Sequence, residues 1–149
     1  QMRQELGEEY IVLLRMHYFI SDRLDISEYE GFAFDFSKYN DVNDLYIVSD
    51  ILITDYSSVF FDYANLKRPI LFYTYDLDKY KDELRGFYID MEKDLPGPLL
   101  FDSLEVINNI KNIEVVNNNY KERYEAFYNK FCLLDDGKAT KRVVEKVIK

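Results

Sequence analysis

The clearest secondary-structure signal in this chain is an apolar run followed by two serines, Ile51-Leu52-Ile53-Thr54-Asp55-Tyr56-Ser57-Ser58. The apolar and β-branched residues predict a buried strand over residues 51–55. Ser57 is a residue type that favours helix N-caps, so we expect a helix from there to about Leu66. The segment 67–69 (Lys-Arg-Pro) then ends that helix, because positive charge suits a helix C-terminus and proline cannot continue it. A buried strand that leads directly into a helix is typical of a parallel α/β sheet.

Strands and helices alternate on both sides of this unit. Before it, the sequence predicts a short helix capped by Asp41, and two strands, over residues 10–16 and 32–36, of which the first is buried on both faces. After it, the sequence predicts a buried strand over residues 69–75 and an edge strand over residues 86–90. Because parallel neighbours need crossover helices, we expect an α/β fold with a Rossmann-like, mostly parallel sheet and flanking helices.

The two ends of the chain have helical patterns. Residues 2–6 predict a short helix that Gly7 ends in the left-handed conformation. Asp102 and Glu105 form a capping-box pattern ahead of an apolar stripe, which predicts the start of another helix. Apolar residues at helical spacing continue to residue 147, and we expect breaks at residues 117–119 and 135–137.

Composition limits the functions open to this chain. Its 149 residues are 48% hydrophobic and 32% charged, which suits one domain with a buried core. The net charge of −9 repels nucleic-acid phosphates and anionic lipids, so we expect no nucleic-acid partner and no membrane binding by this segment itself. Cys132 is the one cysteine, so no internal disulfide is possible, and its apolar neighbours indicate a core residue. No signal peptide or transmembrane run is apparent, so we expect an intracellular location.

Two places in the chain lie where open parallel sheets bind ligands, beyond the carboxyl ends of the strands. One is His17, which follows the strand predicted over residues 10–16, and the other is the turn of residues 54–58. The first turn of a helix has free backbone N–H groups, and Ser57 and Ser58 add hydroxyl donors. This turn is therefore either a phosphate cradle or a well-capped helix start with a spare serine.

His17 and Arg85 each have a functional and a structural interpretation. His17, the only histidine, would donate to a diphosphate oxygen or pass a proton near neutral pH, or it is a structural residue. Arg85 precedes a glycine and would present its guanidinium group to a phosphate, or it forms a surface ion pair with a neighbouring carboxylate. We expect no metal site, because no second histidine or cysteine stands at ligand spacing. Walker A and GxGxxG patterns are absent, which argues against P-loop and dinucleotide-binding proteins.

Several stretches, taken in order, resemble one known family. Residues 51–63 are similar to the signature of the CDP-glycerol:poly(glycerophosphate) glycerophosphotransferases, which build teichoic acid. The resemblance extends through residues 67–73, residues 85–88 and the Asp-Leu-Pro-Gly-Pro turn at residues 94–98, which either contacts a base or only connects the sheet to the helices. Residues 13–17 resemble the arginine-x-histidine element of the family. In all, the resemblance covers about residues 10–112.

The resemblance implies a GT-B architecture, in which two Rossmann-like domains hold the substrates between them. Residues 1–149 would form its C-terminal, donor-binding domain, with residues 113–149 as closing helices. A hydroxyl group of the glycerophosphate chain would attack the phosphorus atom that bears glycerol, and CMP would leave, without a cofactor or a bound metal. The implied catalytic residue is His17, and the implied substrate-binding residues are Thr54, Asp55, Ser57, Ser58 and Arg85.

The implied partners are CDP-glycerol or CDP-ribitol as the donor and a teichoic acid acceptor bound by an N-terminal domain. We expect the full-length protein at the cytoplasmic face of the cell membrane, held there by segments outside this sequence. The chain departs from the family pattern in two ways, because it has no second histidine and no APTFRD-like strand ahead of residue 10. We therefore expect a piece truncated at its N-terminus, inactive alone, in which the strands pair differently or the first strand belongs to sequence not given.

Two other hypotheses remain open on the sequence. The first is a GT-B transferase for a different nucleotide sugar, which would bind UDP-sugars in preference to CDP-glycerol. The second is a non-catalytic α/β interaction module, which would bind no nucleotide and would be insensitive to changes at Ser57 or His17.

Overall fold

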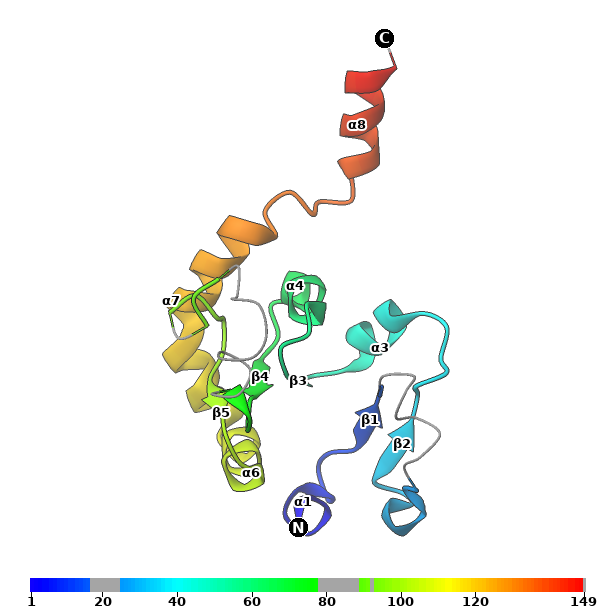
Figure 1. Cartoon of the computed structure of the whole chain (residues 1–149), viewed down its shortest axis with the longest axis vertical. Coiled ribbons are helices and arrows are strands. Elements are labelled where there is room, and N and C mark those ends of the chain that lie inside the picture. The colour runs from blue at the N-terminus through cyan, green and yellow to red at the C-terminus, as the bar shows by residue number, and fades with distance from the viewer. Residues whose placement is uncertain (17–24, 78–88, 92, 149) are drawn as a thin grey trace.

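The computed structural model describes residues 1–16, 25–77, 89–91 and 93–148 (Figure 1). The described residues form two parallel sheets. In the first, β1 (Val12–Leu14) pairs with β2 (Ala33–Asp35), and Leu13 lies opposite Phe34. The second has the order β3-β4-β5 and is formed by β3 (Leu52–Thr54), β4 (Ile70–Tyr73) and β5 (Leu99–Leu100). The predicted α/β class with parallel strands is therefore confirmed.

The division into two sheets differs from the single sheet that the sequence predicts. Within the described residues, β1 is hydrogen-bonded to β2 alone and β3 to β4 alone, so no ladder joins β1 to β3. The prediction that β1 is buried on both faces is wrong, because Val12, Leu13 and Leu14 are each only half-buried. A strand is buried on both faces only where other elements pack above and below its sheet.

The helices between the strands begin and end for local reasons. α3 (Val42–Val48) begins where the predicted cap, the Asp41 carboxylate, accepts a hydrogen bond from the Asn43 N–H at 2.9 Å. α4 (Val59–Tyr63) continues as the 3₁₀ helix η2 (Ala64–Leu66), and Lys67 ends it in the left-handed conformation, with φ 54°. A second 3₁₀ helix, η1 (Ser27–Tyr29), precedes β2.

α1 (Met2–Leu6) is the helix predicted at the start of the chain, but its end differs from the prediction. Gly7 has φ −69° and is right-handed. A Cβ atom at this position would lie 2.4 Å from the carbonyl oxygen of Arg3. Glycine therefore allows a close approach of the backbone here and does not supply a left-handed cap.

The third strand of the second sheet is β5, which the sequence does not predict. The edge strand was expected at residues 86–90, of which 86–88 lie outside the described residues, and Ile89 and Asp90 are not in a strand. The turn before β5 is packed against β4, since the Phe72 N–H donates to the Pro98 carbonyl oxygen at 3.0 Å. A Cβ atom on Gly97 would lie 1.8 Å from the Ile70 carbonyl oxygen. This turn leads directly into β5, so it precedes a strand of the sheet and does not connect the sheet to the helices, which was one of its two predicted roles.

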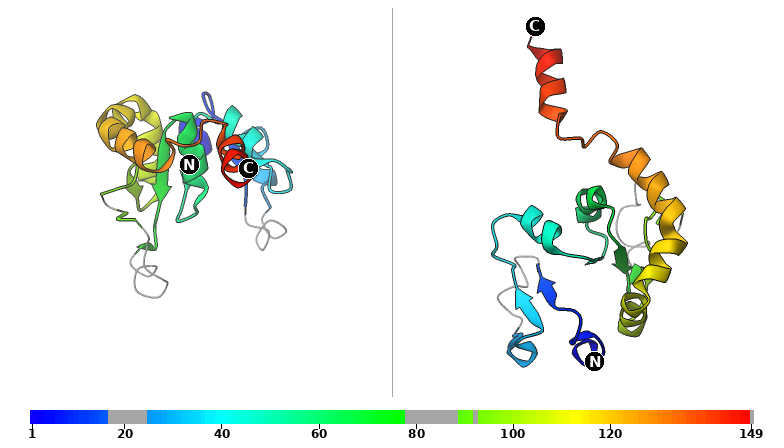
Figure 2. Two further views of the ribbon diagram at one scale, coloured as in Figure 1. Left: turned by 90° about the horizontal axis from the view of Figure 1, so that it is seen from above. Right: turned by 180° about the vertical axis from the view of Figure 1, so that it is seen from behind.

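Three helices form the C-terminal part: α6 (Ser103–Lys111), α7 (Ile113–Phe131) and α8 (Ala139–Val147). The break expected at residues 117–119 is wrong, because these three asparagines lie inside α7, whose tertiary contacts outweigh their weak helix propensity. The expected break at residues 135–137 is confirmed and includes Gly137, with φ 74°. Figures 1 and 2 show α8 projecting away from the rest of the chain.

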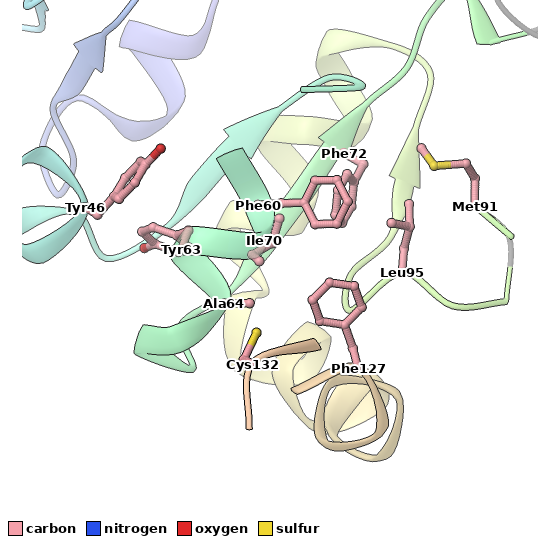
Figure 3. Packing of buried hydrophobic residues seen from close by; sticks show 10 residues of the cluster. All are labelled: Tyr46, Phe60, Tyr63, Ala64, Ile70, Phe72, Met91, Leu95, Phe127 and Cys132. Carbon is pink, nitrogen blue, oxygen red and sulfur yellow. The ribbon is translucent and has the colours of Figure 1, made fainter. Parts of the chain in front are cut away.

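Both faces of the second sheet are covered. On one face, Ile70 and Phe72 of β4 pack with α4, α7 and the turn before β5 (Figure 3). On the other face, Leu71 and Leu100 pack with α1 and α6. Cys132 lies in the first cluster and is 1% exposed, so its interpretation as a core residue is confirmed, and burial raises the pKa of its thiol. Helices on both faces place the carboxyl ends of β3 and β4 at an open edge of this layered structure.

Candidate functional site

The turn after β3 brings together four of the six predicted site residues. Thr54 is the last residue of β3 and is 9% exposed, whereas the side chains of Asp55, Ser57 and Ser58 are exposed. The Asp55 carboxylate accepts a hydrogen bond from the Ser57 N–H, with 3.0 Å between Oδ1 and N. This local bond closes the turn, as aspartate side chains commonly do two residues ahead of their partner. Polar groups are thereby presented at the carboxyl end of a parallel strand.

The start of the following helix differs from the prediction. Ser58, and not Ser57, is the N-cap of α4, and its side chain makes no capping hydrogen bond. α4 has five residues, so it aligns few peptide dipoles and attracts an anion less than a long helix does. Recognition of a phosphate at this turn would therefore depend mainly on the hydroxyl groups and on neighbouring cationic side chains.

Tyr56, in the middle of the turn, faces inward. Its ring packs against the buried cluster around Phe60 and Phe72, and its hydroxyl donates to Oδ1 of Asp76 at 2.9 Å. Burial and this bond to a carboxylate both raise the pKa of Tyr56. Asp76 follows β4, so the contact joins the carboxyl ends of two neighbouring strands. Asp76 was not predicted as a site residue, because no local pattern links positions 20 residues apart.

His17 and Arg85, the other two predicted site residues, lie outside the described residues. The structure does describe Arg15 and Met16, which precede His17, and hydrogen bonds fix both residues. The Met16 N–H donates to Oγ of Ser37 at 3.0 Å, and the Arg15 guanidinium group donates to the Tyr39 carbonyl oxygen at 2.7 Å. The carboxyl end of β1 is therefore fixed against the residues that follow β2.

A cavity of about 400 Å³ lies elsewhere, beside the amino ends of β1, β3 and β4. Three carboxylate side chains are among the residues that line it, namely Glu9, Asp50 and Glu114. A diphosphate would be repelled by these charges at close range. The cavity is also at the opposite end of β3 from the turn of residues 54–58. It is therefore a poor candidate for the phosphate part of a nucleotide donor.

Comparison with known families settles the relationship of this chain. All of residues 1–149 match the family described as CDP-Glycerol:Poly(glycerophosphate) glycerophosphotransferase. The chain belongs to this family. The resemblance of residues 51–63 to the glycerophosphotransferase signature is thereby confirmed, and the structure places that signature on β3, the following turn and α4.

Curated glycerophosphotransferase relatives support the same relationship. The chain is 54% identical over 149 residues to the teichoic acid poly(glycerol phosphate) polymerase of Bacillus subtilis. The aligned region is 100% of this chain and 20% of that protein. It is 50% identical to the teichoic acid glycerol-phosphate transferase of Staphylococcus aureus, and the aligned region is 99% of this chain and 38% of that protein. It is 40% identical to the teichoic acid poly(ribitol-phosphate) polymerase of Bacillus spizizenii, and the aligned region is 99% of this chain and 23% of that protein. The chain thus spans less than two-fifths of each of these relatives.

A solved glycerophosphotransferase relative has the same fold. The wall teichoic acid polymerase TagF superposes with a TM-score of 0.89 at 51% identity, covering 97% of this chain and 35% of that one. A variant of TagF soaked with CDPG superposes equally well. Among the described residues of the present chain, no helix combines the length and the apolar character that crossing a membrane requires.

Proposed function

We propose that residues 1–149 form the donor-binding domain of a glycerophosphotransferase, with residues 113–149 as its closing helices. The full-length enzyme would transfer glycerol phosphate from CDP-glycerol to a growing teichoic acid chain and release CMP. The observation that carries this proposal is the exposed Asp55, Ser57 and Ser58 at the carboxyl end of β3, in a chain of this family. Ligands of parallel α/β sheets bind at that end.

The proposed roles follow from the positions of the residues. The hydroxyl groups of Thr54, Ser57 and Ser58 donate to the diphosphate of the donor, and Asp55 holds the turn closed through its bond to the Ser57 N–H. Arg85 would be a further phosphate ligand. Fixed donors of this kind stabilise the charge that develops on the departing CMP. The proposal requires no metal and no cofactor.

The chemical step is a displacement at phosphorus. The terminal hydroxyl oxygen of the acceptor forms a new bond to the phosphorus atom that bears glycerol. The bond from that phosphorus to the bridging oxygen breaks, and the bridging oxygen leaves with CMP. The proton of the acceptor hydroxyl passes to a base, and His17 would donate to a diphosphate oxygen or pass a proton.

The remainder of the full-length protein would supply what this chain does not. We propose a GT-B arrangement in which a preceding domain binds the teichoic acid acceptor and contributes a second histidine. That protein would act at the cytoplasmic face of the membrane, through segments outside residues 1–149. This chain alone would bind the donor without turning it over.

CDP-ribitol is the second candidate donor, since the family also contains ribitol-phosphate polymerases. Identity favours glycerol, because the chain is 54% identical to a glycerol phosphate polymerase and 40% identical to a ribitol-phosphate polymerase.

An NMR titration of the chain with CDP-glycerol tests the proposal, with CDP-ribitol, CMP and UDP-glucose beside it. Saturable shifts of the amides of residues 54–58 with CDP-glycerol, lost in the Ser57→Ala/Ser58→Ala variant, are expected. Ser27→Ala is a matched control, because the Ser27 N–H donates to Asp25 in the same kind of turn at a distant site, at 2.9 Å. Stronger shifts with UDP-glucose would favour another nucleotide-sugar transferase. A folded chain with no shifts for any nucleotide would favour a non-catalytic interaction module.

A further inference from the structure

We propose that the hydrogen bond between Tyr56 and Asp76 positions the turn of residues 54–58 for the donor. This inference rests on the proposed function and names two positioning residues for the same site. Neither residue needs to contact the donor for this role. Their effect would be exerted through the direction in which the neighbouring Asp55, Ser57 and Ser58 point.

The first support is that both the ring and the hydroxyl group of Tyr56 make contacts with the protein. Its ring packs against the buried cluster that includes Phe60 and Phe72, and its hydroxyl donates to Asp76 at 2.9 Å. Asp76 is half-buried and follows β4, which pairs with β3 from Leu52 to Thr54. The turn is therefore tied to the neighbouring strand beyond the point where the backbone ladder ends.

The second support is the contrast between Tyr56 and its neighbours. Tyr56 faces the protein, whereas Asp55 and Ser57 on either side of it are exposed. Because adjacent side chains in an extended turn point in different directions, fixing Tyr56 inward fixes its neighbours outward. α4 is too short to orient this turn by itself, since its five residues form few intrahelical hydrogen bonds. A tertiary contact is then needed to hold the polar groups in one arrangement.

Loss of this preorganisation should lower the affinity for the donor more than it lowers the stability of the fold. A group that is already oriented gives up less conformational entropy when the ligand binds. Removing the tyrosine hydroxyl would leave the ring packed in the core and release the turn from Asp76. A merely structural contact would lower the melting temperature and leave the affinity unchanged.

The test compares donor affinity and melting temperature across one set of variants. Tyr56→Phe and Asp76→Ala should each weaken CDP-glycerol binding about tenfold, the effect of one hydrogen bond to a charged group. The double variant should be no weaker than either single variant, because both remove the same bond. Asp76→Asn keeps an acceptor oxygen and should restore binding to within about twofold of the wild type.

Tyr124→Phe is the matched control. It also removes one tyrosine hydroxyl, which donates to the Arg68 carbonyl oxygen at 2.8 Å. Its donor affinity should equal that of the wild type. If Asp76→Asn and Asp76→Ala both bind more tightly, Asp76 acts by repelling the diphosphate, and the positioning role is wrong. Equal affinity of Tyr56→Phe and the wild type would also overturn it.

Amide hydrogen exchange without ligand separates this inference from the proposed function. Tyr56→Phe should speed exchange of the Ser57 N–H, which is bonded to Asp55 in the wild type. If the wild-type chain binds no CDP-glycerol, the proposed function fails, whereas the exchange rate still reports whether Tyr56 holds the turn. Unchanged exchange at Ser57 in Tyr56→Phe would overturn the positioning role even if the donor binds.

Discussion

Tyr63 shows how this chain buries a polar group. Its side chain is 0% exposed, and its hydroxyl donates to the Ser49 carbonyl oxygen at 2.8 Å. The same carbonyl oxygen also accepts from the Arg68 guanidinium group at 2.7 Å. A buried hydroxyl without a partner would destabilise the fold by about 1–3 kcal/mol. The contact joins α4 to the segment between α3 and β3.

Stability should fall at alkaline pH partly because of Tyr63. Burial raises its pKa to about 12, and the nearby Arg68 charge only partly opposes this. The neutral phenol is the form that the folded state favours. Its contribution is therefore fully present below the unfolded pKa of about 10 and is lost as the pH rises through about 12. Urea unfolding between these pH values should show a steep loss of stability, and Tyr63→Phe should reduce the slope. Identical slopes for the two proteins would contradict this assignment.

Gly97 lies where no side chain fits. Because a Cβ atom would lie 1.8 Å from the Ile70 carbonyl oxygen, Gly97→Ala should push β4 and the turn apart and destabilise the chain by about 3 kcal/mol or more. Gly31→Ala is the control, since Gly31 has φ 79° and no heavy atom within 4 Å of the added Cβ atom. Its effect should be only about 1 kcal/mol, from backbone strain. Urea denaturation measures both, and equal losses would refute the role of the close contact.

α6 shows how a local sequence pattern sets the start of a helix. The Asp102 carboxylate accepts from the Glu105 N–H at 2.9 Å, as the capping-box pattern predicts. The Glu105 carboxylate, however, accepts from the N–H of Phe101, one residue before the cap, at 2.6 Å. The two bonds tie β5 to α6. Because α6 covers one face of β4, its start also fixes that layer.

Removal of this cap should weaken the fold measurably. Asp102→Ala leaves the Glu105 N–H without its partner and should lower the free energy of unfolding by about 1 kcal/mol. Asp102→Asn keeps an oxygen acceptor and should lose less. Urea unfolding followed by circular dichroism gives both values. A neutral Asp102→Ala variant would show that the end of β5 alone holds the start of α6.

At the level of the whole chain, α8 stands apart from the body (Figure 1). None of its residues, all of which are described, is buried, and Val143, Val144 and Val147 are 60%, 45% and 75% exposed. Its first turns are attached by Arg142, which donates to the Asp136 carboxylate at 2.7 Å. An exposed ion pair of this kind contributes about 1 kcal/mol or less.

Truncation after Gly137 should therefore leave the rest of the chain intact. We expect the melting temperature to change by less than about 2 °C, because no buried apolar contact is lost. A matched truncation after Asn112 removes α7 together with Phe127 and Cys132, which are buried in the core, and should abolish cooperative unfolding. A large fall in melting temperature after the first truncation would mean that α8 packs against the body in solution.

The predictions from sequence succeeded where the pattern was local. Residues within a few positions of one another were enough to predict several features. These are the strands β3 and β4, the caps of α3 and α6, and the end of η2 at Lys67. β5 was missed because two residues, Leu99 and Leu100, carry no periodicity. For the candidate site, the turn of residues 54–58 was found from its composition, but its bond to Asp76 was not.

The amino-acid order was enough to establish an alternation of strands and helices, parallel strands, and polar residues at the carboxyl end of β3. Those features depend on side-chain periodicity and on capping groups that act over one or two turns. Only the tertiary structure decided three features. They are the order of the strands, the separate sheet of β1 and β2, and the contact between Tyr56 and Asp76. Such contacts join residues about twenty positions apart, and many pairings satisfy the same local patterns. The packing of both faces of β4 favours the observed pairing, because it buries Ile70, Leu71 and Phe72 together.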